Sequence, residues 1–335
     1  MPSQCLRYVK AISQLNLSIL NSLTMPEAYA SHPDFGYARD FIGYGENSIH
    51  PQWPNNAKIA VSFVINYEEG GERSVLEGDG VSESNLRENP AGPQTVNERN
   101  YNAESEYEYG SRAGWWRLFR LFNAHKMKFT LYAVARAIEH NPDVAKRCVE
   151  EGHDVASQFV SLTQSKTSKR QNANNRTWRL PLGELPRLLH RKGKGLHTQS
   201  RHLTQISHRV RPQGLVLRPP QPSLANPRPQ VYEELGEELV WASDTYADDV
   251  PYWTDLAHKR DSPNPKGCLM IPYSYDCNDF KFHVPGSGFR NPQGFLTHLK
   301  NAFDVLYEEG EEGSPKMMTI GLHCRIIGRP GRFRR

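Results

Sequence analysis

The sequence predicts an α/β fold with a parallel sheet, because short apolar runs of strand length alternate with segments of helical periodicity. The length of 335 residues suits one large α/β barrel or two smaller domains. No run of about 18 apolar residues occurs in the sequence, so no membrane-spanning segment is expected. A single block of unusual composition interrupts the alternation, so we expect the fold to be incomplete.

The first elements come after a predicted N-terminal arm, residues 1–35. Residues 36–335 are expected to form the folded domain. Ile59–Asn66 is a continuous apolar run that ends in an acidic, glycine-containing loop, which is typical of a buried strand with polar groups at its C-terminal end. Residues 72–110 are acidic and rich in Asn and Gly, and we expect a loop there.

The next segments continue the alternation. Arg112–His125 has the wide apolar face of an amphipathic helix. A second helix should begin at Asn141-Pro142-Asp143 with Asn141 as its cap, and Gly152 should end it. Strands are predicted on either side of this helix, over Lys128–Ala135 and His153–Ser157.

Regular patterning returns near Val231. We expect a helix over Val231–Leu239 and strands over Leu239–Ser243, Leu269–Tyr275 and Lys316–Cys324. Asn291-Pro292 is predicted to cap the clearest helix of the chain. The apolar face of that helix recurs at spacings of three and four, through Phe295, Leu299, Ala302, Phe303 and Leu306.

The unusual block is residues 158–230. It contains fourteen Lys and Arg residues but one acid, Glu184, while the rest of the chain carries 27 basic and 36 acidic residues. Six of the eight prolines of this block lie between Pro212 and Pro229, and no sustained helical or strand period is present. Such a strong charge asymmetry is foreign to an ordinary domain. Fourteen positive charges would attract phosphates, but almost no aromatic residues are interleaved, so we expect no nucleic-acid partner.

Cysteine usage bears on the compartment. The five cysteines, Cys5, Cys148, Cys268, Cys277 and Cys324, are odd in number and scattered, without a CxxC pair. This pattern argues against a disulfide framework or a structural zinc site. It favours a reducing compartment, and we predict a cytoplasmic protein.

Seven blocks, in order, carry a family resemblance. They are IGYG, HPQWPNNAKIAVSFVINYEEGGE, YEYGSRAGWWRLFRLF, NPDVAKRCVEEGHDVAS, WASDTYADDVPYW, IPYSYDCND and PKMMTIGLHCRIIGRPGR. Together they resemble the allantoinase-like branch of the polysaccharide deacetylase (NodB-homology) family over roughly residues 36–157 and 231–332. The resemblance implies a distorted (β/α) barrel and hydrolysis of non-peptide carbon–nitrogen bonds. Family members remove N-acetyl groups from chitin or peptidoglycan sugars, and the allantoinase-like branch opens a cyclic ureide ring.

The sequence departs from the family inside the basic block. GHDVAS would continue in the family into a histidine and an aromatic-rich stretch, but Gln158-Phe159-Val160 follows Ser157 here. The expected Gly-Trp-Tyr segment is also replaced. We interpret residues 158–230 as a frame-shifted or mis-spliced stretch, because they stand in place of the family sequence rather than beside it. An incomplete barrel lacks lateral strand pairing, so we expect a chain that is poorly folded or inactive.

The candidate catalytic residues lie at predicted strand ends, where barrel enzymes place their active sites. Glu68 and Glu69 follow the first strand, and either could activate a water molecule. The resemblance places them where many deacetylases carry a pair of aspartates. His323 lies on the last strand with Arg325 on the same face, and this pattern predicts an acid toward a leaving nitrogen and a site for a carbonyl or anionic oxygen.

Other acids follow strands and are candidates for substrate contact or for orienting His323 and Arg325: Asp244, Asp249, Asp276 and Asp279. The resemblance also bears on cofactors. Metal-dependent members use one Asp and two His four residues apart, whereas here His153 is followed at position 157 by Ser. We therefore expect no metal ligand at this place and no zinc cofactor.

The function predicted from the sequence is hydrolysis of a small cyclic ureide by a metal-independent allantoinase-like enzyme. Two alternatives remain, namely an N-acetyl sugar deacetylase of chitin or peptidoglycan and a non-catalytic binding protein. The expected partner is a small molecule, without nucleic acid or membrane, and self-association into a homo-oligomer is left open.

Overall fold

The computed structural model describes residues 41–89, 94–158, 241–243, 246–255, 267–284, 286 and 288–333. Chain contacts divide the molecule into two compact units. The first contains Met1–Glu46, Pro212–Leu239 and Trp253–Cys268, and the second contains Asn47–Arg211, Val240–Tyr252 and Leu269–Arg335. The predicted arm, most of the basic block and the helix predicted over 231–239 lie outside the described residues. Among the described residues, no helix has the length and apolar character needed to cross a membrane.

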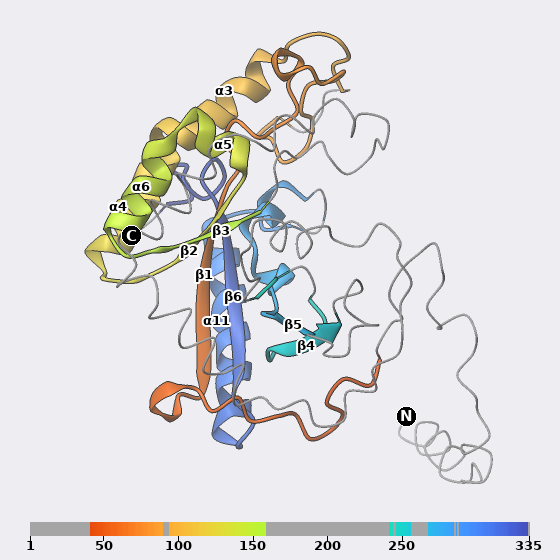
Figure 1. The fold of residues 1–335 in the computed structure, drawn as a ribbon, viewed down its shortest axis with the longest axis vertical. Helices are drawn as coiled ribbons and strands as arrows, with labels where there is room; N and C mark the ends of the chain where they lie inside the picture. Colours follow the sequence, from red (N-terminus) through yellow and green to blue (C-terminus); the bar gives the residue numbers. More distant parts are fainter. Residues whose placement is uncertain are drawn as a thin grey trace, which may run out of the picture. The chain divides into compact units, whose positions relative to one another are not determined.

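A parallel four-stranded sheet in the order β3-β2-β1-β6 forms the centre of the second unit. Its strands are β1 (Ile59–Tyr67), β2 (Thr130–Ala133), β3 (Asp154–Ser157) and β6 (Lys316–His323). β1 and β6 are paired from Ile59–Lys316 to Asn66–His323, and Figure 1 shows these two long strands side by side. The predicted α/β class with a parallel sheet is confirmed, while closure into a barrel stays a prediction.

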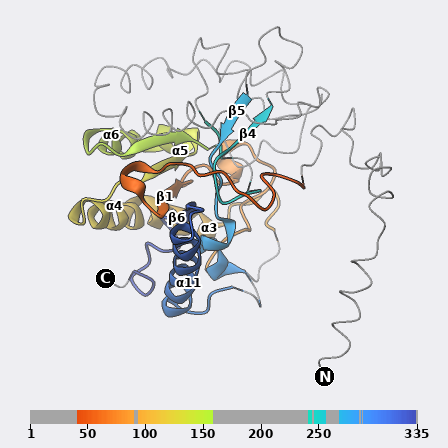
Figure 2. The ribbon, with the colours of Figure 1, turned by 90° about the horizontal axis from the view of Figure 1, so that it is seen from below.

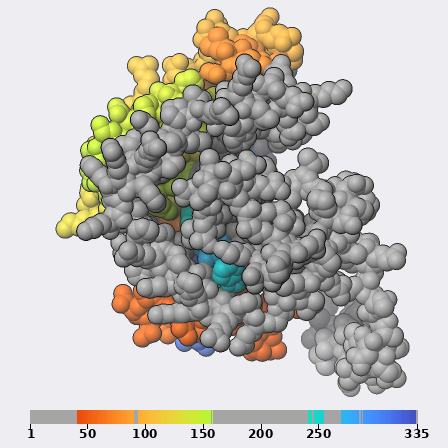
Figure 3. Space-filling view, viewed as in Figure 1, coloured from red at the N-terminus to blue at the C-terminus, as the bar shows by residue number. Residues whose placement is uncertain are grey.

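Helices cover this sheet. α4 (Trp115–Ala124) packs Phe122 against Phe63 of β1, with ring centroids 5.2 Å apart. α5 (Ala135–His140) and α6 (Pro142–Glu150) follow β2, and the long α11 (Pro292–Glu311) runs along β1 and β6 (Figures 1 and 2). α5 and α6 (green) and the region of α3 (yellow-orange) form part of the face seen in Figure 3. The apolar core lies between these helices and the sheet.

Most of the predicted elements of the first half and the last helix and strand are confirmed. Asn291 Oδ1 accepts a hydrogen bond from the Gly294 N–H at 2.9 Å, so the predicted cap of α11 is correct. Gly152 ends α6 with a left-handed φ of 70°. Asn141, in contrast, makes no side-chain cap to α6, because its amide group donates to Ser111 Oγ instead. Asn141 is thus the N-cap residue of α6, as predicted, but it does not cap the helix through its side chain.

The loop predicted over residues 72–110 was wrong at its end. α3 (Tyr101–Tyr109) forms there, followed by one turn of π-helix, η4 (Gly110–Gly114), and a short 3-10 turn, η3 (Val75–Glu77), lies earlier. Asn100 caps α3 by accepting the Ala103 N–H at 3.1 Å. Only Ala103 and Tyr107 of α3 are buried, so the apolar period is too sparse for sequence reasoning to detect. α5 was also missed, and it starts inside the strand predicted over 128–135.

Sequence reasoning was least accurate around residues 239–284. Of the strand predicted over 239–243, Ala242 alone forms a described isolated bridge, to Met270. The strand predicted over 269–275 is β5 (Gly267–Met270), which lies in a two-stranded sheet with β4 (Tyr252–Asp255). Two 3-10 turns follow, η7 (Tyr275–Cys277) and η8 (Asp279–His283). On α11, Phe303 is not part of the core face, because it is partly exposed and stacks on Tyr307.

Candidate active site

Four charged side chains meet where β1 and β6 end. Glu68 and Glu69 directly follow β1, His323 is the last residue of β6, and Arg325 lies two residues further on. The register pairs Asn66 with His323, which places the ends of the two strands at the same level. All four side chains are buried, with at most 6% of each residue exposed. Charges that are buried to this extent require close partners.

Asp279 holds His323 from the first position of η8. Its Oδ1 lies 2.6 Å from His323 Nδ1, and its Oδ2 accepts the backbone N–H of His323 at 2.7 Å and that of Ile327 at 3.1 Å. Burial acts to lower the pKa of His323, but Asp279 and then Glu68 outweigh it, and the pKa is raised above its ordinary value. The imidazole is thus held in one orientation and favours the protonated form.

Glu68 lies on the other side of the imidazole. Its Oε1 is 3.7 Å from His323 Nε2, and its Oε2 is 2.9 Å from Arg325 Nη2. Gln158 Nε2 donates to Oε1 at 3.2 Å. Burial acts to raise the pKa of Glu68, but the positive charges of Arg325 and His323 hold it below its ordinary value. Glu68 is therefore an ionised carboxylate that faces the imidazole.

Glu69 is bound differently. Its Oε2 accepts the Glu68 N–H at 3.0 Å, and its Oε1 accepts the backbone N–H of Arg325 at 3.2 Å. A Cβ atom at Gly110 would lie 2.3 Å from Oε1, so the carboxylate fits directly against the η4 backbone. Burial raises the pKa of Glu69 to about 7, against the opposing effect of Arg325. Both oxygens of Glu69 thus tie the chain after β1 to the chain after β6.

Arg325 is the cation of the cluster. Its guanidinium lies over the Tyr107 ring of α3, 4.2 Å from the ring centroid, and its Nη1 is 3.8 Å from Glu69 Oε1. Nε and Nη1 are buried without a hydrogen-bond partner among the described residues. Arginine stays charged in proteins, and two buried guanidinium nitrogens without acceptors are costly. The guanidinium therefore has capacity for an additional oxygen acceptor.

The sequence did not predict a hydrogen-bonded group of three polar side chains, Asn66, Tyr273 and Asn278, close to the ends of β1 and β6. Tyr273 OH accepts from Asn66 Nδ2 at 3.2 Å and from Asn278 Nδ2 at 2.7 Å. A Cβ at Gly321, two residues before the end of β6, would lie 2.0 Å from Tyr273 OH. A glycine inside a strand often marks a close approach of this kind, and Gly321 was the available signal. Nothing in the spacing of Asn66, Tyr273 and Asn278 predicted that they meet.

Comparisons with known proteins give the family. The chain is 42% identical over 317 residues to a putative polysaccharide deacetylase of Schizosaccharomyces pombe, and the match covers 88% of each chain. The chain belongs to the polysaccharide deacetylase family. The family model for polysaccharide deacetylase matches residues 103–188, which include the start of the basic block.

Two crystal structures are similar to this polysaccharide deacetylase family member. One, a probable polysaccharide deacetylase of Pseudomonas aeruginosa PAO1, has 40% identity and a TM-score of 0.66, with 89% of this chain and 88% of that chain covered. The other, Puue allantoinase, has 39% identity, the same TM-score and the same coverage. The recognised family and its hydrolase character are thus confirmed.

The described residues do not fit the zinc site of the metal-dependent family members. His153, the candidate ligand, is 1% exposed and its ring stacks on Phe129 at a centroid distance of 3.8 Å. Its Nε2 is 2.9 Å from Asn123 Oδ1 of α4. Burial, with a smaller contribution from Lys128, lowers the pKa of His153 to about 4. This histidine is a core residue under α4, and no catalytic step is assigned to a metal at this place.

Of the other predicted acids, the two that the structure describes do not join Asp279 in the cluster. The carbonyl of Asp249 accepts the Met317 N–H at 2.8 Å, which places Asp249 beside the start of β6, at the other end of the strand from His323. Asp276 is exposed and pairs with His298 at 3.1 Å. Asp244 lies outside the described residues. A surface hollow lined by residues 50 and 52–56 precedes β1, at the other end of the strand from Glu68.

Proposed function

We propose that this chain carries the machinery to hydrolyse an amide-type carbon–nitrogen bond in a small cyclic ureide, without a catalytic metal. The observation that carries the proposal is that His323 lies between the carboxylates of Asp279 and Glu68 where β1 and β6 end, with Arg325 paired to Glu68. A held imidazolium, an ionised carboxylate and a guanidinium are the groups that such a hydrolysis needs.

Geometry favours Glu68 as the base. Both oxygens of Glu69 accept backbone N–H groups, whereas Oε1 of Glu68 faces His323 Nε2. The pKa of Glu69, about 7, suits a base better than the lowered pKa of Glu68, but a base must first reach the proton it removes. A carbonyl oxygen at Arg325 would share the guanidinium with Glu68 and so increase the basicity of Glu68. We assign Glu69 a positioning role.

The proposed reaction has two proton transfers. A water molecule gives a proton to Glu68 and its oxygen bonds to the carbonyl carbon, whose oxygen is bound by Arg325. The carbon–nitrogen bond then breaks, and His323 Nε2 gives its proton to the leaving nitrogen. The products are a carboxyl group and an N–H group on the opened ring. Asp279 holds the imidazole throughout and favours its charged form.

The choice of a cyclic ureide rests on similarity to Puue allantoinase, at 39% identity over most of both chains. The name of the fission yeast relative supports a second candidate, an acetylated sugar, because deacetylation requires the same base, acid and oxyanion-binding groups. The two candidates differ in substrate size and in the ring that must enter the site.

The test is turnover of allantoin and of chitin oligomers by the full chain, with a Glu68→Gln variant as the matched control. Turnover of allantoin that is lost in the variant supports the proposal. Turnover of the sugar alone would replace the proposed substrate by the second candidate. Cooperative unfolding of the chain would show that it is folded. If such a folded chain turns over neither allantoin nor chitin oligomers, the site is not catalytic, and the alternative of a non-catalytic binding protein is favoured.

Whether this particular chain folds and turns over substrate is a separate question from what its site could catalyse. Residues 158–230, most of which lie outside the described residues, are interpreted as a replacement of family sequence, so we expect a poorly folded or inactive chain. Exchange of this block for that of the fission yeast relative should restore folding and turnover. A transcript that encodes a histidine directly after Ser157 in another frame would confirm the interpretation, and a transcript with no such frame would contradict it.

A further inference from the structure

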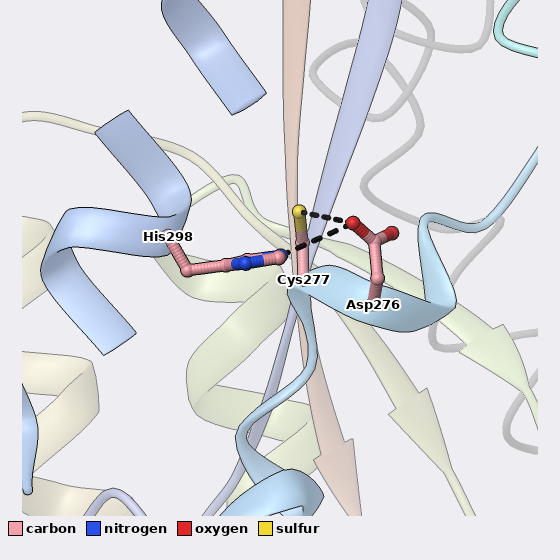
Figure 4. A group of neighbouring side chains, drawn as sticks. All are labelled: Asp276, Cys277 and His298. Atoms are coloured by element: carbon pink, nitrogen blue, oxygen red, sulfur yellow. Dashed lines mark hydrogen bonds and ion pairs between the residues drawn. The ribbon is translucent and has the colours of Figure 1, made fainter. Parts of the chain in front are cut away.

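A second group of reactive side chains lies outside the proposed active site. Asp276 and Cys277 of η7 and His298 of α11 each offer one ligand atom, and the three atoms lie within 4.8 Å of one another. Figure 4 shows the three side chains pointing toward one another from two separate segments. Ser274 binds the Thr319 N–H, four residues before His323, so this group lies beside the middle of β6 rather than at its end.

Two of the three separations are close to the edges of a tetrahedral metal site. Asp276 Oδ2 lies 3.1 Å from His298 Nε2 and 3.7 Å from Cys277 Sγ. Bond lengths of about 2.1 Å to nitrogen and oxygen and about 2.3 Å to sulfur give ideal edges of about 3.4 Å and about 3.6 Å. The ligand atoms of Cys277 and His298 lie within 4.8 Å of each other, so side-chain rotations that bring these two closer would place all three atoms at bonding distance from one ion.

The chemical types of the three ligand atoms indicate which metal would bind. Sulfur and imidazole ligands favour zinc over calcium or magnesium, which prefer oxygen. A thiolate and a carboxylate supply two negative charges, which balance Zn²⁺. Asp276 and His298 are partly exposed, so water has access to a fourth position, while Cys277 is 1% exposed.

We propose that Asp276, Cys277 and His298 bind Zn²⁺, with water as the fourth ligand. Binding replaces the proton of the Cys277 thiol, which is released to solvent. The ion joins η7 to α11. Asn278 and Asp279 follow Cys277 directly, so the ion also fixes the start of the segment that holds His323. The scattered cysteines argued against a structural zinc site, and the sequence near His153 against a catalytic one, but the site proposed here uses a single cysteine. The proposal does not rest on the proposed hydrolysis.

The test is Co²⁺ binding to the metal-stripped full chain, followed by displacement with Zn²⁺. A thiolate-to-cobalt charge-transfer band with tetrahedral visible bands is expected, and Zn²⁺ should abolish both. His298→Gln and Asp276→Asn should each weaken binding by more than about tenfold. Cys277→Ser should remove the charge-transfer band, which excludes the other cysteines as its source.

His140→Gln is the matched control. His140 Nε2 lies 3.4 Å from Glu77 Oε1, so this is another accessible histidine–carboxylate pair, and among the described residues it does not belong to a group of three metal-ligating side chains. The control should bind Co²⁺ as the parent does. No charge-transfer band in the parent chain, whatever its state of folding, overturns the proposal. A band that survives Cys277→Ser, or equal affinity in His298→Gln and the parent, overturns it as well.

Discussion

Asp279 binds His323 twice, with one carboxylate oxygen at the ring Nδ1 and the other at the backbone N–H of the same residue. The two contacts fix both the rotation of the ring and the place of the chain after β6. They leave Nε2 directed toward Glu68. The acid proposed for the reaction is therefore oriented by a residue 44 positions earlier in the chain.

Asp279→Asn should move the alkaline limb of the pH–rate profile to lower pH. Asp279 raises the pKa of His323, so its neutralisation lowers that pKa and the ring loses its proton earlier as pH rises. The turnover number at neutral pH should fall by about 100-fold. The profiles of parent and variant check this, with thermal unfolding as the control for stability. An unshifted alkaline limb would contradict the assignment of His323 as the acid.

Glu68→Gln and Glu69→Gln should affect turnover differently. Loss of the proposed base at Glu68 should reduce the turnover number by roughly 100- to 10,000-fold. Glu69→Gln retains one oxygen for a backbone N–H group. The fold-reduction in its turnover number should be less than a tenth of the fold-reduction caused by Glu68→Gln. Steady-state kinetics on allantoin measure both. A larger loss for Glu69→Gln would exchange the roles of the two residues.

The free energy of unfolding should depend on pH through Glu69. Its pKa rises from 4.5 to about 7 on folding, so the folded chain binds more protons between these values. The contribution of Glu69 is full below about pH 4.5 and is lost as pH rises through about 7, by at most on the order of 3 kcal/mol. Urea unfolding at several pH values should show a steeper loss in the parent than in Glu69→Gln. Parallel curves for the two proteins would argue against a raised pKa.

Arg325→Met should destabilise the chain by about 3–5 kcal/mol, because Glu68 is then left buried without its cation. The double variant Arg325→Met, Glu68→Gln should recover part of this loss, since neither charge remains. Urea unfolding of the two single variants and the double variant gives the coupling free energy. Additive effects would show that the 2.9 Å contact between Glu68 and Arg325 contributes little.

Gly114→Ala should weaken the junction between η4 and the chain after β6. The added Cβ would lie 2.0 Å from the carbonyl oxygen of Cys324, a backbone atom that cannot rotate away. We expect a loss of about 1–3 kcal/mol. Gly80→Ala is the control, because a Cβ there meets nothing within 4 Å. Equal thermal stability of the two variants would contradict the close approach.

The sheet and the strand-end charges could be predicted from the sequence because their signals are local. An apolar run followed by Glu68 and Glu69 identifies a strand and its polar end without any knowledge of its neighbours. Asp279 could not be separated from Asp244, Asp249 and Asp276 in this way, since all four are acids that follow predicted strands. Only packing of η8 against β6 selects it. α3 was missed because its burial depends on contacts of Tyr107 with distant residues rather than on its own periodicity.

The pairing of β1 with β6 joins residues separated by more than 250 positions. During synthesis at roughly 5–20 residues per second, β1 waits roughly 10–50 s for the strand that completes its hydrogen bonds. Until then one edge of an apolar strand has no partner, which is a template for association with other chains. The nascent protein should therefore depend on chaperones for the interval between the emergence of these two strands.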